Sequence, residues 1–165
     1  MSVITVIGST NIDLVATTAK FPETGETVIG NNFQVFPGGK GANQAVGIAQ
    51  LRGEVNFITK IGHDDFGRNA LENLENYGIK SDYILRDDEA PTGVALIEVD
   101  GEGRNRIVVV PGANARLSVA DIQNLRQVIE KSDVILVQLE IPLETVGYIL
   151  QLGHRANAKI GRAHV

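Results

Sequence analysis

Residues 36–45, FPGGKGANQA, bring three glycines, a lysine and an asparagine together at a predicted junction between a strand and a helix. Glycine lets backbone N–H groups approach a ligand closely, and a helix that begins near Gly41 directs its free N–H groups and its positive dipole end to the same point. The segment is not a Walker A loop, which has a longer spacer before its Gly-Lys pair and a Ser or Thr after the lysine. It therefore predicts a site for a polar small molecule, which need not be a nucleotide.

Polar side chains also follow two predicted strands. Asn11 and Asp13 come after the strand-like residues 3–8, and Glu140 follows the predicted strand of residues 134–139. Ligands of open α/β sheets bind outside the carboxyl ends of the strands, so these side chains are expected to meet the glycine-rich segment. Carboxylates accept hydrogen bonds from hydroxyl groups while Asn and Lys donate them, which is the inventory that a sugar requires. The predicted site residues are Asn11, Asp13, Gly39, Lys40, Gly41, Asn43 and Glu140.

The elements that must position these residues alternate between strands and helices. The strand patterns cover residues 3–8, 55–61, 83–85 and 134–139, and the helical patterns cover residues 41–52, 64–77, 118–130 and 142–155. Asp64 is a predicted N-cap, Ser118 with Asp121 forms a predicted capping box, and Pro142 opens the last helix. This alternation predicts an α/β fold with a mainly parallel sheet that carries helices on both faces.

Two extended stretches, residues 27–36 and 92–110, interrupt the alternation, and the second is a predicted hairpin that turns at residues 100–103. Its strands are apolar on both faces. A small sheet that stands off the main layer would bury one face against substrate and the other against a second subunit. The alternative is that these strands join the main sheet.

The composition narrows the class of protein. With 165 residues, 43% of them hydrophobic, the chain is long enough for one domain. A net charge of −5 and a pI near 5.2 weigh against nucleic acid or a membrane surface as the main partner. The chain has no cysteine, and Met1 leads almost directly into the first apolar run, so we expect a cytoplasmic protein. The three histidines are not placed to activate a nucleophile.

Several motifs resemble those of the PfkB family of carbohydrate kinases, and the resemblance runs from about residue 3 to residue 159. The motifs that carry it are GSTNID (8–13), PETGETVIG (22–30), GGKGANQA (38–45), GHDDFG (62–67), TGVALI (92–97), GAN (112–114) and QLE (138–140). Within the family, TGVALI together with QLEIPLE is more similar to the ribose-phosphorylating members than to fructokinases or adenosine kinases. The chain resembles the amino-terminal half of such a protein.

The resemblance implies a Rossmann-like, ribokinase-like α/β domain over residues 1–159, with a small β-sheet lid from residues 13–36 and 92–110 that also forms a homodimer. It implies transfer of the γ-phosphoryl group of ATP to the 5-hydroxyl of D-ribose, with Mg²⁺ and K⁺. Asn11, Asp13, Gly39, Lys40, Asn43 and Glu140 fall on the family's ribose-contact positions. The lid residues Ala95 and Ile97 would cover the sugar.

The chain also departs from the family pattern. The Gly-Ala-Gly-Asp motif that supplies the family's catalytic base is absent from the sequence, so no catalytic residue and no metal ligand is predicted here. Residues 160–165 have no family counterpart and are interpreted as a non-native tail, which would leave an open sheet edge where a strand should begin near Ile160. We therefore expect an inactive half of a kinase. The alternatives are a non-catalytic remnant that binds a sugar or a partner, and a PfkB kinase for another sugar or a nucleoside.

Overall fold

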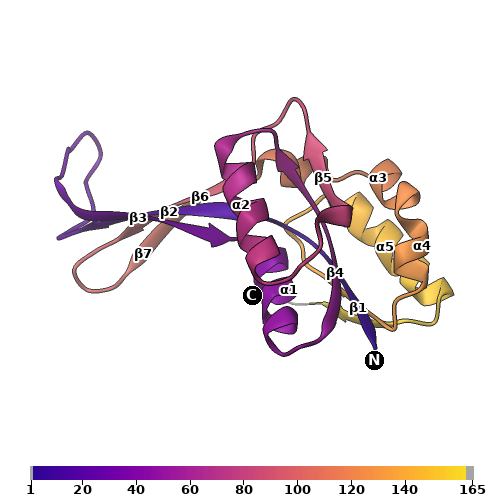
Figure 1. Cartoon of the computed structure of the whole chain (residues 1–165). Helices are drawn as coiled ribbons and strands as arrows, with labels where there is room; N and C mark the ends of the chain where they lie inside the picture. Colours follow the sequence, from indigo (N-terminus) through magenta and orange to yellow (C-terminus); the bar gives the residue numbers. More distant parts are fainter. Residues whose placement is uncertain (1, 163–165) are drawn as a thin grey trace.

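The computed structural model describes residues 2–162 and contains two separate sheets (Figure 1). The main sheet has five parallel strands in the order β5-β4-β1-β8-β9. These strands are β1 (Val3–Ile7), β4 (Glu54–Gly62), β5 (Ile84–Asp87), β8 (Val134–Val137) and β9 (Lys159–Arg162). The predicted parallel α/β fold is thereby confirmed.

Helices cover both faces of the main sheet. α1 (Lys40–Gln50) and α2 (Asp65–Asn76) lie on one face, and α3 (Val119–Asn124), α4 (Arg126–Glu130) and α5 (Leu143–Arg155) lie on the other. Side chains alternate across a strand, so Val6 packs in the cluster under α1 and α2 while Ile7 packs in the cluster under α3 to α5. Both side chains are fully buried. The two cores explain why the central strands β1 and β8 carry apolar side chains on both faces.

The helix starts follow the predicted capping signals. Asp64 caps α2 by accepting a hydrogen bond of 2.7 Å from the Gly67 N–H, and Ser118 forms a capping box with Asp121 at the start of α3. The single helix predicted as far as Glu130 is wrong, because Leu125 has a φ of −102° and separates α3 from α4. Two short 3₁₀ helices, η1 (Ser81–Tyr83) and η2 (Gly112–Arg116), complete the connections.

The small sheet has four strands in the order β3-β2-β6-β7 and projects from the main body (Figure 1). Its strands are β2 (Asn11–Thr18), β3 (Gly30–Gly38), β6 (Gly93–Val99) and β7 (Asn105–Val110). β6 and β7 form the predicted antiparallel hairpin, whose turn is held by Asp100 through the N–H groups of Glu102 and Arg104. The extended residues therefore form a sheet of their own, and the alternative in which they join the main sheet is wrong.

The edge of the main sheet beside β8 differs from the expectation. β9 pairs with β8 in parallel, from Val134 opposite Lys159 to Val137 opposite Arg162, so this edge is filled. Residues 160–162 of the predicted tail belong to this strand, while residues 163–165 lie outside the described part of the chain. Within residues 2–162, no helix has the length and apolar character that crossing a lipid bilayer requires.

Candidate functional site

The predicted site residues of β2 lie where the small sheet leaves the main sheet. Asn11 and Asp13 are two positions apart on β2, so their side chains project from the same face. In the strand register, Asn11 lies opposite Gly38 of β3 and Gly93 of β6. Both neighbours lack a side chain, which leaves room for the Asp13 carboxylate over Gly38 and for the amides of Asn11 and Asn114 over Gly93.

The glycines before α1 allow its first turn to approach the end of β1. Gly39 has a φ of 94°, and a Cβ on it would lie 2.7 Å from the Ser9 carbonyl oxygen. A Cβ on Gly41 would lie 2.7 Å from the Ser9 nitrogen. Gly39 is also the N-cap of α1 and has no side chain to cap the helix. The Ala42 N–H donates instead to the Ser9 carbonyl over 3.0 Å, and the Lys40 N–H donates to Glu140. The Gly41 N–H, which has no partner among the described residues, is the first-turn donor left for a ligand.

Glu140 is held at both carboxylate oxygens. The Ser9 hydroxyl donates to Oε2 over 2.5 Å, and Lys40 Nζ lies 3.1 Å from Oε1. Burial alone would raise the pKa of Glu140, but the Ser9 hydroxyl and the Lys40 ammonium outweigh it and lower the pKa below the usual 4.5. Glu140 is therefore an ionised hydrogen-bond acceptor at neutral pH.

Asp13 is the second carboxylate of the site, and its pKa is shifted in the opposite direction from that of Glu140. Burial raises its pKa above the usual 3.8, and the negative charge of Glu140 raises it further. Its carboxylate leans over Gly38, where a Cβ would collide with it. The two carboxylates thus sense each other's charge, and hydroxyl groups that donate to both would relieve their repulsion.

The remaining predicted residues lie around this centre. Ala95 and Ile97 of β6 share the face of Asp13, because Asp13 pairs with Ala95 in the register and Ile97 is two positions further along. Asn43 lies in the first turn of α1 after Lys40, and its side chain is exposed. Asn43 makes no recorded hydrogen bond to another predicted site residue among residues 2–162. The main contacts therefore join Lys40 and Glu140, with Asp13 near them.

Two polar residues of the site were missed by reasoning from residue type and strand ends. Ser9 holds Glu140, and Asn114 of η2 hydrogen-bonds to the side chain of Asn11 over 2.8 Å. Ser9 follows a predicted strand directly, so the same strand-end argument could have found it. Asn114 lies 103 residues after Asn11, in the short helix η2, and in the sequence only its place in the GAN motif (112–114) marks it out.

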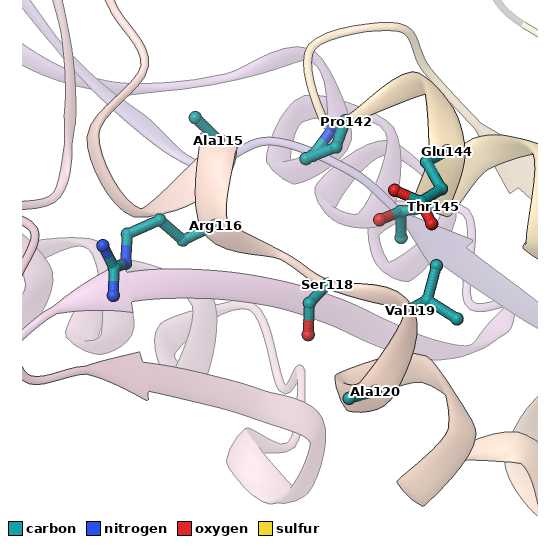
Figure 2. A pocket seen from close by; sticks show the side chains of 8 residues that line it. All are labelled: Ala115, Arg116, Ser118, Val119, Ala120, Pro142, Glu144 and Thr145. Carbon is teal, nitrogen blue, oxygen red and sulfur yellow. The ribbon is translucent and has the colours of Figure 1, made fainter.

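Two hollows lie outside this centre. One, of about 350 Å³, lies between η2 and the starts of α3 and α5, with Arg116 and Glu144 on opposite sides of it (Figure 2). Three of its polar side chains already have partners: Arg116 pairs with Asp87 and Glu89, the Ser118 hydroxyl donates to Asp121, and the Thr145 hydroxyl donates to the Leu117 carbonyl. The other, of about 590 Å³, lies between α2 and the small sheet and is lined mainly by apolar side chains, among them Phe66, Val94, Leu96 and Val110. Within residues 2–162, no three His, Asp or Glu side chains gather as a metal site would require, so no chemical step is assigned to a metal here.

The chain spans about half the length of the characterised proteins to which it is similar. It is 46% identical to ribokinase from Bacillus subtilis over 151 residues, which are 92% of this chain and 51% of that protein. It is 39% identical to deoxyribokinase from Salmonella typhi over 157 residues, which are 95% of this chain and 51% of that protein.

Solved structures give the same family likeness. The ribokinase from Thermotoga maritima matches with a TM-score of 0.88 and 42% identity, over 98% of this chain and 52% of that one. The Arabidopsis thaliana ribokinase complexed with ribose and ATP matches with a TM-score of 0.88 and 28% identity, over 98% of this chain and 53% of that one. The family model for pfkB family carbohydrate kinases matches residues 1–158. With its parallel sheet, its small second sheet and its glycine-rich helix start, the chain belongs to the pfkB family of carbohydrate kinases.

Proposed function

We propose that this chain is the sugar-binding half of a ribokinase, which transfers the γ-phosphoryl group of ATP to D-ribose and forms D-ribose 5-phosphate. The observation that carries the proposal is the meeting of Asp13, Lys40 and Glu140 at the junction of the two sheets. Identity to the Bacillus subtilis ribokinase supports ribose as the first candidate substrate. The Arabidopsis thaliana ribokinase, whose complex contains ribose and ATP, has the same fold over this half.

The charges of the site suit a polyol. Asp13 and Glu140 accept hydrogen bonds from hydroxyl groups, while the Lys40 ammonium donates to hydroxyl oxygens. A sugar hydroxyl does both at once, so neighbouring hydroxyls can bridge the two kinds of group. Two carboxylates and one lysine give the centre a formal negative charge, which favours an uncharged ligand over an anion.

The small sheet supplies an apolar cover for the same site. Ala95 and Ile97 of β6 pair with Val109 and Ile107 of β7, and all four side chains share the face of Asp13. We assign this face to the carbon side of the bound sugar, where it would exclude water when the lid closes.

The opposite face of the small sheet, here called the outer face, carries Leu14, Phe33, Val35, Leu96, Val108 and Val110. Phe33 and Val108 are each 61% exposed, and the 590 Å³ hollow opens beside them at Leu96 and Val110. A contiguous exposed apolar surface of this kind is typical of an interface. We propose that a second copy of the chain covers it, so that the lid joins a homodimer.

The chemistry of phosphoryl transfer needs more than this chain offers. A proton acceptor for the sugar hydroxyl, donors for the transferred phosphoryl group and a metal ion are required. The chain aligns with about half the length of its relatives. Among residues 2–162, no three acidic or His side chains lie close enough together to bind a metal ion. We therefore assign ATP, Mg²⁺, K⁺ and the catalytic base mainly to the half of the relatives that this chain does not match.

A chimera tests the proposal. The chain alone and the chain joined to the second half of the Bacillus subtilis ribokinase are compared in an assay of sugar-dependent ADP release, with D-ribose, 2-deoxy-D-ribose, D-fructose and adenosine. We expect activity with ribose in the chimera and none in the chain alone. Ribose-dependent ADP release by the chain alone would contradict the proposal that this chain binds the sugar while the other half supplies the catalytic groups.

The panel also separates the other candidates. Preference for 2-deoxyribose would favour a deoxyribokinase, a possibility that the 39% identity to the Salmonella typhi enzyme supports. Preference for fructose or adenosine would assign the site to another substrate of the family. Calorimetric binding of ribose by a chain whose chimera is inactive would favour a non-catalytic sugar-binding protein.

A further inference from the structure

Asn114 lies where three strands of the small sheet meet the main body, at the starts of β2 and β6 and the end of β7. It belongs to η2 and is only 2% exposed. Its Oδ1 accepts a hydrogen bond of 2.9 Å from the Thr10 N–H. Its Nδ2 lies 3.0 Å from the Thr10 carbonyl, 3.0 Å from the Pro111 carbonyl and 2.8 Å from Asn11 Oδ1. Thr10 directly precedes β2, Asn11 is its first residue, and Pro111 directly follows β7. A Cβ on Gly93, the first residue of β6, would collide with both Asn11 Oδ1 and Asn114 Nδ2.

The backbone fixes which way the Asn114 amide faces. A backbone N–H can only donate and a backbone carbonyl can only accept, so the atom beside the Thr10 N–H must be oxygen and the atom beside the two carbonyls must be nitrogen. The nitrogen of Asn114 then faces the side chain of Asn11. Only the oxygen of Asn11 can accept from it, so the orientation of Asn11 follows from that of Asn114.

This orientation leaves the Asn11 nitrogen turned outward. Asn11 Nδ2 has no hydrogen-bond partner among the described residues, and it is not one of their fully buried unpaired polar atoms. It therefore keeps contact with solvent on the face that Asn11 shares with Asp13. The neighbouring positions on β3 and β6 are Gly38 and Gly93, so no side chain from those positions covers it.

We propose that Asn114 is a positioning residue that turns the Asn11 amide so that its nitrogen donates to a hydroxyl oxygen of the sugar. The inference rests on the proposed function and deepens it. Asp13 and Glu140 offer only acceptors, so a third acceptor at Asn11 would leave the hydroxyl oxygens on that side without a donor. Asn114 thus selects a ligand that presents an acceptor beside Asn11.

The first test is a double-mutant cycle on the chain itself, with Asn114→Ala, Asn11→Ala and the double variant, and with D-ribose affinity measured by calorimetry. Each single change should weaken binding roughly two- to tenfold, the value of one hydrogen bond. If Asn114 acts through Asn11, then Asn114→Ala should have no further effect in the Asn11→Ala background. Additive losses would mean a general structural role and overturn the proposal.

Thr59→Val is the matched control. The Thr59 hydroxyl is fully buried and lies 2.9 Å from the Thr10 hydroxyl, next to the same segment but away from the Asn11 amide. This change should lower stability and leave ribose affinity unaltered.

A second variant decides the matter if Asn114→Ala does not fold. Asn11→Asp keeps an oxygen for Asn114 and replaces only the outward nitrogen by an acceptor. It should weaken ribose binding at least tenfold, by loss of the donor and repulsion of the hydroxyl oxygen. Asn69→Asp, an exposed change on α2, controls for the added charge. Unchanged affinity in Asn11→Asp would show that Asn11 offers its oxygen to the sugar, and would overturn the proposal.

An NMR measurement without sugar separates this inference from the proposed function. The Asn11 side-chain amide signals should move in Asn114→Ala and stay in place in Thr59→Val. If the parent binds no sugar of the panel, the proposed function fails. Moving signals would then still support the positioning of Asn11, and unmoved signals would overturn it.

Discussion

Ser9 donates a hydrogen bond of 2.5 Å to Glu140 across 131 residues of sequence. The bond joins the end of β1 to the segment after β8, and these two strands are neighbours in the main sheet. Lys40 Nζ, at 3.1 Å, occupies the other carboxylate oxygen. Glu140 is therefore presented to a ligand in one fixed orientation, which a flexible surface carboxylate would not have.

Replacing Ser9 with alanine should destabilise the fold at neutral pH by about 1 kcal/mol, the value of a hydrogen bond to a charged acceptor reduced for partial exposure. The folded-state pKa of Glu140 is below its usual 4.5. The stabilisation is therefore present above that value and is lost as the pH falls through the folded-state pKa. Urea unfolding of the parent and Ser9→Ala at about pH 7 and about pH 3 should show the difference shrink. The exposed Ser81→Ala is the control, and an equal difference at both pH values would refute the assignment.

Changing Asp13 should separate stability from binding. The pKa of Asp13 is raised by burial and by Glu140, so its charge costs stability once the pH rises above the folded-state pKa. Asp13→Asn should therefore raise the melting temperature at about pH 7, and the gain should vanish below pH 3.8, where the carboxyl is protonated in both states. A melting temperature that falls at neutral pH would contradict this.

In the chimera, Asp13→Ala should lower kcat/KM for ribose by roughly ten- to a hundredfold, because charge-assisted hydrogen bonds contribute about 1.5–3 kcal/mol each. The KM for ATP should barely change. An unchanged kcat/KM for ribose in a folded variant would show that Asp13 is not part of the site.

Two glycines of α1 should respond in opposite directions to the same substitution. A Cβ on Gly41 would lie 2.7 Å from the Gly8 carbonyl carbon, so Gly41→Ala should destabilise the fold by about 1–3 kcal/mol and weaken ribose binding. A Cβ on Gly47 meets nothing within 4 Å, so Gly47→Ala should stabilise the helix by about 0.5–1 kcal/mol. Denaturant unfolding measures both, and similar effects at the two positions would argue against the close crossing of α1 and β1.

The proposed dimer predicts that a charge on the outer face separates the subunits. Val108→Glu should shift the chain from dimer to monomer in analytical ultracentrifugation, since an unpaired charge buried at an interface is costly. Leu51→Glu, at the exposed carboxyl end of α1, should leave the mass unchanged. A parent chain that is monomeric at high concentration would remove the dimer from the proposal.

Local signals in the sequence were sufficient for much of the fold. Asp64 and Ser118 cap helices through bonds within a few residues, so their roles can be predicted without knowing the tertiary structure. The break at Leu125 was predicted wrongly, because no glycine or proline marks it in the sequence. The pairing of β9 with β8 joins two separate segments and was also predicted wrongly. The parallel pairing of β2 with β6 also joins distant segments, and the pattern of residues 11–18 did not identify a strand.

The same distinction applies to the site. Strand ends drew attention to Asp13 and Glu140, because their position relative to a sheet follows from the strand pattern. The bonds from Ser9 to Glu140 and from Asn114 to Asn11 span 131 and 103 residues, so residue type alone could not reveal them. Serine and asparagine are also common in loops for local reasons.

The parallel pairing of β1 with β8 has a kinetic consequence. The first strand must wait for residues 134–137 before its second edge is covered, and closing so long a loop costs entropy before any contact repays it. During synthesis, β1, α1 and the small sheet leave the ribosome while that edge of β1 is still unpaired. The bond from Ser9 to Glu140 forms only after this docking. If the site binds ribose as proposed, the sugar stabilises only chains in which β8 has already paired with β1.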